Sequence, residues 1–331
     1  MNETTTPSPF VRKAFSRIGW AFCAILLITT ALQALWILVP RLFWGENNWA
    51  TDSSWGNWIG SFAPLYMVGI PVGLWILRKL PARTPEDHKM PWSSYWALVP
   101  ICIFLMYTGS FVGTLLSLLL SGGTAENTVA ELASDTNPLK VVVMVILAPL
   151  LEEYLCRKQL IDRTRQYGEK TAVLLSALIF GLLHQNLYQF FYAFALGLVF
   201  GFLYLRTGRL RYTVFLHALF NFMGAVVAPW FLSLYTSEDL QNIPVTATTE
   251  ELLELYRDIL PELLLSLLYA MILIGCFIAG LILLITERKR LIWKESEEPL
   301  SRGTVFKTVY WNAGMVLFAL LCLAAFVLVL L

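Results

Sequence analysis

Long runs of apolar residues alternate with short polar segments along almost the whole chain. About 20 apolar residues cross the hydrocarbon core of a bilayer as a helix, and lipid offers no partners to the backbone groups of other structures. The pattern therefore predicts an all-α polytopic integral membrane helical bundle with about nine transmembrane helices. The runs lie at about 18–39, 57–77, 95–120, 139–157, 171–185, 189–205, 212–233, 263–285 and 308–331.

The composition fits a membrane protein and excludes several other classes. The 331-residue chain is 57% hydrophobic and 14% charged, whereas a soluble domain carries roughly a quarter charged residues. A net charge of +1 and the lack of a Lys/Arg-rich arm argue against a nucleic-acid partner. The five cysteines are isolated and form no C-x-x-C pair, so no disulfide or zinc framework is indicated. We expect a multi-pass protein in the lipid bilayer of a cell membrane, the plasma membrane of a prokaryote.

The basic residues predict an orientation. Of the 24 Lys and Arg residues, only Arg41, Lys140 and Arg257 do not fall on one side of the nine predicted spans. An excess of Lys and Arg marks cytoplasmic loops. The sequence therefore predicts an N-terminus inside and a C-terminus outside. The inner basic segments are 12–17, 78–89, 157–170, 206–211 and 288–307.

The polar residues within spans divide the chain into three parts. Residues 1–138 are expected to hold the first three helices and their loops. Residues 139–233 concentrate the intramembrane polar residues and are expected to form a catalytic core of helices 4–7. Residues 234–331 are expected to hold an acidic outer loop and helices 8–9. Within that loop, the capping box Thr248-x-x-Glu251 predicts a short amphipathic helix on the outer interface.

Two adjacent glutamates, Glu152 and Glu153, end an otherwise apolar run. Ionisable residues cost on the order of 3 kcal/mol or more in hydrocarbon and are usually functional. Neighbours on a helix are about 100° apart, so the two carboxylates are not expected to face one target. Glu153 and Arg157 have the i, i+4 spacing of an ion pair, which leaves Glu152 as the freer base. The alternative is a solvated pair at a helix end, neutralised by Arg157 and Lys158.

Two further spans carry histidines at helical spacing. Phe180 and His184 share one face, as do His217 and Asn221. Such residues often serve as hydrogen-bonding partners between helices. Together with Glu152, however, they supply a base for water and donors for an oxyanion.

A metal-bound water is a second route to the same chemistry. Glu152, His184 and His217 could hold one zinc ion with a water in the fourth position. The H-E-x-x-H motif of zinc proteases is absent. The sequence therefore leaves open a divalent metal or no cofactor, and both routes lead to hydrolysis.

Helix rise gives an expected depth for each group. Counted from Arg157 as the inner boundary, Glu152 lies roughly 8 Å deep at 1.5 Å per residue. Counted from Lys170, His184 lies roughly 21 Å deep, which does not agree. Between the histidines, the G-x-x-x-G of Gly197 and Gly201 predicts close helix packing around the site.

The three motifs E-E-x-x-x-R, F-x-x-x-H and H-x-x-x-N, in this order over about 139–225, resemble the CAAX-protease and bacteriocin-processing family. This family, also called CPBP or Abi, includes the Rce1-type prenyl-protein endopeptidases. The resemblance implies that Glu152 activates the water with help from His184. It implies that His217 and Asn221 bind the oxyanion. Glu153, Arg157 and Phe180 would support the site. Leu155 and Lys158 depart from the residues that many members have around the arginine.

The expected function is therefore an intramembrane endopeptidase with a cavity that faces the cytoplasm. The substrate is expected to be a peptide or protein, and a prenylated C-terminus, a leader peptide or a membrane-embedded segment all fit. Two alternatives stay open: a transporter or proton-coupled carrier with a Glu/His relay, and a non-catalytic immunity or scaffold protein. Transporters often show two related halves, and the absence of an internal repeat here favours the enzyme.

Overall fold

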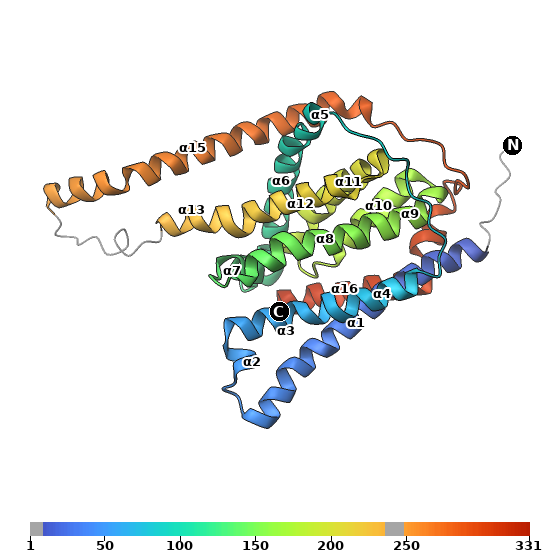
Figure 1. Cartoon of the computed structure of the whole chain (residues 1–331), viewed down its shortest axis with the longest axis horizontal. Coiled ribbons are helices and arrows are strands. Elements are labelled where there is room, and N and C mark those ends of the chain that lie inside the picture. The colour runs from blue at the N-terminus through green and yellow to red at the C-terminus, as the bar shows by residue number, and fades with distance from the viewer. Residues whose placement is uncertain (1–8, 236–247) are drawn as a thin grey trace.

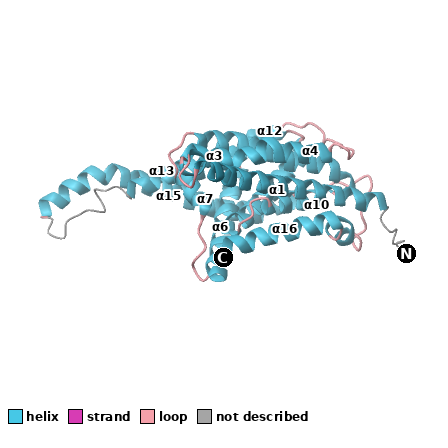
Figure 2. Ribbon diagram, turned by 90° about the horizontal axis from the view of Figure 1, so that it is seen from below, coloured by secondary structure: helices cyan, strands magenta, loops and turns pink. Residues whose placement is uncertain are grey.

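The computed structural model describes residues 9–235 and 248–331, and every regular element in these ranges is a helix (Figures 1 and 2). This confirms the predicted all-α class. Together with the apolar spans described below, it makes the chain a polytopic membrane protein.

One layer of the bundle combines the two ends of the chain (Figure 1). Helix α1 packs against α16 and against the continuous stretch from α3 to α4. Gly19 permits the contact with α16, because a Cβ there would meet the backbone of Gly314. The elements of this layer are α1 (Pro9–Trp44), α3 (Ser54–Ala63), the π-helical η1 (Pro64–Gly69), α4 (Ile70–Leu77) and α16 (Ala313–Leu330), with the short α2 (Trp49–Asp52) before α3 and η7 (Phe306–Tyr310) before α16.

The middle of the bundle is built from the segment predicted as the catalytic core. A helical run with two π-helical stretches leads through α8 into α9, turns at Gly168 and returns as α10. Helix α11 packs along α10, and α12 packs across η2 and α8. The elements are η2 (Val141–Leu147), α8 (Ala148–Glu153), η3 (Tyr154–Gln159), α9 (Leu160–Thr164), η4 (Arg165–Tyr167), α10 (Glu169–Leu182), α11 (Leu187–Thr207), α12 (Leu210–Phe222), η5 (Met223–Val227) and α13 (Ala228–Tyr235).

The third group of helices covers α11 from the other side. Helix α6 (Leu98–Ser121) packs on α11, and α15 (Thr249–Glu287) packs on α6. The short helices α5 (Trp92–Trp96), α7 (Thr128–Ser134) and η6 (Arg288–Arg290) lie in the connections.

Helix α15 corrects the prediction of a separate amphipathic helix. Its 39 residues run without a break from the acidic segment into the predicted span. The segment before Pro261 is rich in Leu and Glu, both strong helix formers, so helix formation extends from the span instead of starting anew. The side chains of residues 251–256 lie outside the described part of the structure.

The two glycines of the G-x-x-x-G segment bring α11 close to α10, as predicted. A Cβ on Gly197 would lie 2.9 Å from Cα of Ala177, and one on Gly201 would lie 3.2 Å from a methyl of Val173. A larger side chain at Gly197 would meet backbone, so it would require the helices to shift, and one at Gly201 would press on Val173. This contact holds α10 against α11 next to the histidine at the end of α10.

Seven helices in the described ranges are long and apolar enough to cross a membrane. The two predicted spans that do not qualify carry the first two motifs, whereas the span with His217 and Asn221 does qualify. The stretch 139–157 is helical throughout but contains Lys140 and Arg157 besides the two glutamates. Helix α10 has only 14 residues, about 21 Å at 1.5 Å per residue. The count of nine spans stays a prediction.

Basic segments that are distant in sequence meet at one end of the bundle. Ion pairs join Arg83 to Glu297, Arg209 to Asp87, Lys294 to Glu86 and Arg206 to Glu169. The hydrogen bond from Arg209 holds the pKa of the Asp87 carboxyl below its usual value. This gathering agrees with a single basic side of the protein. Which face of the bilayer it occupies stays a prediction.

Candidate active site

Glu153 and Arg157 form the ion pair that their spacing predicted. Arg157 Nε lies 2.9 Å from Glu153 Oε2, and its Nη2 lies 3.2 Å from Oε1. Both side chains are fully buried. A buried charge without a partner is strongly destabilising, so each of these residues requires the other.

The remaining contacts of Arg157 fix its position between two helices. Its Nη1 donates a hydrogen bond of 2.8 Å to Ser176 Oγ, and that hydroxyl donates to the carbonyl of Cys156 at 2.6 Å. The guanidinium also lies over the ring of Phe180, 4.6 Å from its centroid. A planar guanidinium can make these contacts at once, whereas a lysine ammonium cannot. These contacts fix the positions of Glu153 and Arg157 next to the candidate site.

His217 faces both glutamates, which corrects the prediction that they cannot share a target. Its Nδ1 lies 3.2 Å from Glu153 Oε1, and its Nε2 lies 3.8 Å from Glu152 Oε2. The two carboxylates still leave α8 in different directions. Helix α12 packs across α8, so the imidazole enters between them and presents one nitrogen to each. An ionised carboxylate only accepts hydrogen bonds, so Nδ1 of His217 carries the proton toward Glu153.

Glu152 is the more open of the two carboxylates, as predicted. Its side chain is 22% exposed, whereas that of Glu153 is fully buried. The hydroxyl of Tyr66, from η1 in the neighbouring layer, lies 3.5 Å from Glu152 Oε1. Glu152 is therefore partly accessible and lies beside His217 and Tyr66.

His184 lies at the C-terminal end of α10, on the other side of Phe180 from His217. The Phe180 ring is 5.1 Å from the ring of His184 and 5.5 Å from that of His217. Nδ1 of His184 donates to the Phe180 carbonyl at 2.8 Å. Within the described residues, Nε2 is the ring nitrogen of His184 left for other partners.

A short polar network holds the turn after His184. Asn186 donates to the His184 carbonyl at 2.7 Å and to Gln189 Oε1 at 2.9 Å. Gln189 in turn donates to the hydroxyl of Tyr192 at 2.8 Å. Gln185 has a φ of 56°, a left-handed conformation that is uncommon outside glycine. The network and the strained turn fix the end of α10 that carries His184.

The expected depths of Glu152 and His184 agree when both are counted from the same turn of the chain. Arg157 is fully buried, and the helix continues to Tyr167, so Arg157 does not mark the inner boundary. Counted from the turn at Gly168, Glu152 and His184 each lie 16 residues away, about 24 Å at 1.5 Å per residue. The depth of each residue in the membrane stays a prediction.

Asn221 links α12 to the start of the segment predicted as the catalytic core. Its amide nitrogen donates a hydrogen bond of 2.7 Å to the carbonyl of Met144 in η2. A side-chain amide has two N–H donors. One of them is thus used between helices, and the second is left for another acceptor.

The three residues predicted as metal ligands do not form a ready ligand set. Within the described ranges, no group of three His, Cys, Asp or Glu side chains could hold a metal ion. Both nitrogens of His217 already face carboxylates. Zinc binding by Glu152, His184 and His217 stays a prediction, and the chemistry proposed below uses protein side chains alone.

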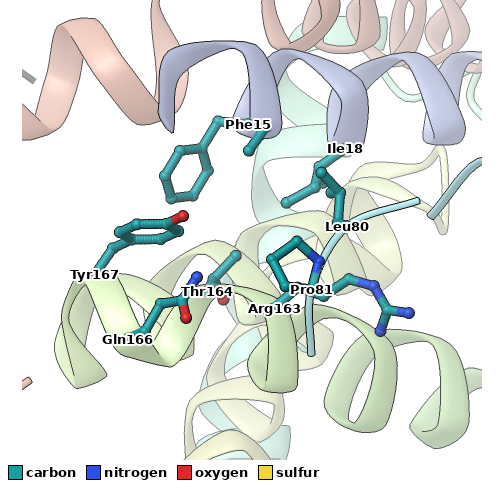
Figure 3. A pocket seen from close by; sticks show the side chains of 9 residues that line it. Phe15, Ile18, Leu80, Pro81, Arg163, Thr164, Gln166 and Tyr167 are labelled. Atoms are coloured by element: carbon teal, nitrogen blue, oxygen red, sulfur yellow. The ribbon is translucent and has the colours of Figure 1, made fainter. Parts of the chain in front are cut away.

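A small pocket lies at the basic end of the bundle (Figure 3). Phe15 and Ile18 of α1 lie on one side, and Gln166 and Tyr167 of η4 lie on the other. The side-chain oxygen Oε1 of Gln166 is buried and has no hydrogen-bond partner among the described residues. None of the predicted site residues lines this pocket, so the two sites are separate.

Two residues of the site were missing from the sequence prediction. Ser176 stands four residues before Phe180 and eight before His184, so extending the helical spacing would have found it. Tyr66 is 86 residues from Glu152, and no pattern in the sequence connects them. Only the packing of α3–α4 against the middle helices brings it near.

Comparisons with known proteins point to one family. Residues 134–223 match the family model described as "Type II CAAX prenyl endopeptidase Rce1-like". The "Putative membrane peptidase YdiL" of Bacillus subtilis (strain 168) is 32% identical over 164 residues, 47% of this chain and 66% of that protein. The "Membrane-embedded CAAX protease MroQ" of Staphylococcus aureus (strain USA300) is 26% identical over 152 residues, 43% of this chain and 60% of that protein.

The matches cover the site but not whole proteins. The chain spans less than two thirds of the length of either relative. No solved structure matches the chain. The family match contains every motif residue from Glu152 to Asn221, whereas Tyr66 lies outside it. Over residues 134–223, the chain is similar to the Rce1-like CAAX protease family, and both relatives carry the name of a membrane peptidase or protease.

Proposed function

We propose that the protein is an intramembrane endopeptidase in which Glu152 activates a water molecule. The observation that carries the proposal is the placement of His217 between Glu152 and the Glu153–Arg157 pair. A partly open carboxylate beside a fixed histidine is an arrangement suited to hydrolysis. The family match over residues 134–223 and the names of both relatives support a peptidase.

In the first step, Glu152 removes a proton from water as the oxygen attacks the scissile carbonyl carbon. The carbonyl π bond opens, and its electrons move to the oxygen. Nε2 of His217, when protonated, and the second N–H of Asn221 are the donors assigned to this oxyanion. Preorganised donors of this kind are often the largest single contribution to such catalysis.

In the second step, the tetrahedral intermediate collapses and the carbon–nitrogen bond breaks. The proton held by Glu152 passes to the leaving amine, which restores the carboxylate. His184 assists by orienting the water or the amine through Nε2, because its Nδ1 is bound to the Phe180 carbonyl. Glu153, Arg157 and Ser176 keep His217 in place and take no proton in this scheme.

The proposed substrate is a peptide segment that reaches the site from within the membrane. Two names among the matches refer to CAAX proteins, so a prenylated C-terminal peptide is the first candidate. The site lies deep in the bundle, which favours a substrate with an apolar anchor. We place the opening of the cavity on the basic, cytoplasmic side.

A comparison of membrane peptides tests this function. Cells with the wild-type protein and cells with Glu152→Ala are compared by quantitative mass spectrometry. We expect at least one peptide terminus that is present with the wild type and absent with the variant. Glu126→Gln, which changes an exposed carboxylate in a loop, serves as the control and should retain the cleavage. Identical peptide pools in wild-type and Glu152→Ala cells would contradict the proposal.

A further inference from the structure

One contact of Glu152 comes from a part of the chain outside the family match. Tyr66 belongs to η1, and its hydroxyl lies 3.5 Å from Glu152 Oε1. On the other side of the carboxylate, Oε2 faces Nε2 of His217 at 3.8 Å. The two oxygens of Glu152 therefore face two different side chains from two different helices.

The ring of Tyr66 is held by a row of stacked aromatic side chains. Trp58, Phe62 and Tyr66 are four residues apart along α3 and η1 and lie on one face. The rings of Trp58 and Phe62 stack at 5.2 Å, and those of Phe62 and Tyr66 stack at 6.0 Å, both with an interplanar angle of 18°. Each ring thus restricts the next.

The far end of this row is anchored by hydrogen bonds. The indole N–H of Trp58, itself almost fully buried, donates to Asp135 Oδ2 at 2.7 Å. Ser54 also donates to that oxygen, and the backbone N–H of Asn137 donates to Oδ1. The row therefore runs from a fixed carboxylate, Asp135, to the open carboxylate of Glu152.

We propose that Tyr66 is a positioning residue for Glu152, an inference that rests on the proposed function. A phenol O–H donates to one carboxylate oxygen and so directs the other toward His217 and the attacking water. A glutamate side chain has three rotatable bonds, and a single contact does not fix it. The resting distance is long, but catalytic hydrogen bonds often tighten only when substrate binds. The anchored row keeps the phenol in reach.

Tyr66→Phe tests the inference, because it removes the hydroxyl and keeps the stacked ring. The substrate is the peptide that wild-type membranes cleave and Glu152→Ala membranes do not. We expect kcat to fall about tenfold, with KM and the melting temperature of the purified protein unchanged. Tyr310→Phe is the matched control, because it removes a buried hydroxyl without a hydrogen-bond partner in the described part of the chain, and it should leave kcat unchanged.

A second variant tests the aromatic row itself. Phe62→Leu leaves the hydroxyl of Tyr66 but removes the ring stacked on it, so kcat should fall less than in Tyr66→Phe. The inference is overturned if Tyr66→Phe has the kcat of the wild type, or if it changes only KM or the melting temperature. Loss of cleavage in Glu152→Ala would still support the proposed function in that case. Unchanged cleavage in Glu152→Ala would instead remove the proposed function itself.

Discussion

At the scale of single residues, Arg157 is a buried charge whose hydrogen-bond donors are bound by neighbouring side chains. Its guanidinium binds both oxygens of Glu153 and the hydroxyl of Ser176, away from water. A lysine keeps the charge but cannot donate to both oxygens of Glu153 and to Ser176 in this planar geometry. We expect Arg157→Lys to lower the free energy of unfolding by roughly 2 kcal/mol, since a hydrogen bond to a charged group is worth about 1.5–3 kcal/mol.

Thermal unfolding in detergent measures the loss of stability. We also expect peptide cleavage to fall, because Glu153 accepts a hydrogen bond from His217. Arg78→Lys is the control, because Arg78 is exposed and its described contact is with the ring of Trp75. A wild-type melting temperature for Arg157→Lys would show that the guanidinium hydrogen bonds to Glu153 and Ser176 do not stabilise the protein.

The sequence predicted the charged pair better than it predicted the surroundings of the pair. The i, i+4 rule applies within one helix and therefore found Glu153 with Arg157. It says nothing about a neighbouring helix, so it missed that His217 enters between the two glutamates. Tyr66 was out of reach for the same reason, because its contact depends on how two layers pack.

At the scale of elements, α10 and α11 make a close contact near the site. A Cβ on Gly197 would lie 2.9 Å from Cα of Ala177, which is backbone and cannot rotate away. Overpacking of this kind costs about 1–3 kcal/mol. We expect Gly197→Ala to lower the melting temperature and the rate of cleavage, because α10 carries His184.

Gly224→Ala is the matched control for this substitution, since a Cβ on Gly224 would meet no atom within 4 Å. It should leave the melting temperature and the rate unchanged. Equal effects of the two substitutions would show that close packing at Gly197 does not support the site.

The helices were predictable to different degrees for physical reasons. An apolar run is visible in sequence, so every predicted span has a helix at its place. The turn after α10 is not visible, because Leu182 and Leu183 continue the apolar run, and α10 therefore ends at Leu182, before the predicted end at 185. A separate short helix was predicted before the span, whereas α15 is one continuous helix. A capping box indicates where a helix can begin but not how far it continues.

At the scale of the whole molecule, the basic end of the bundle predicts the orientation in the membrane. Loops from four parts of the chain meet there through ion pairs. We expect Lys79→Cys to react with a membrane-impermeant maleimide only when the cytoplasmic face is accessible. Glu126→Cys should react in intact cells. Four of the five native cysteines are buried and contribute little background.

Labelling of Lys79→Cys from outside intact cells would show that the basic end faces the outside. The opening of the site would then lie on the outer face, and the arrangement of Glu152, His184 and His217 would be unaffected.

The central claim is that Glu152 is the base that activates water. The direct measurement is kcat/KM of the purified wild type and of Glu152→Gln for the identified peptide, with the melting temperature of each. Glutamine keeps the size of the side chain but cannot take the proton. The account predicts that kcat/KM falls at least about 1,000-fold while the melting temperature stays close to that of the wild type. A Glu152→Gln protein that cleaves within a few-fold of the wild-type rate would contradict it.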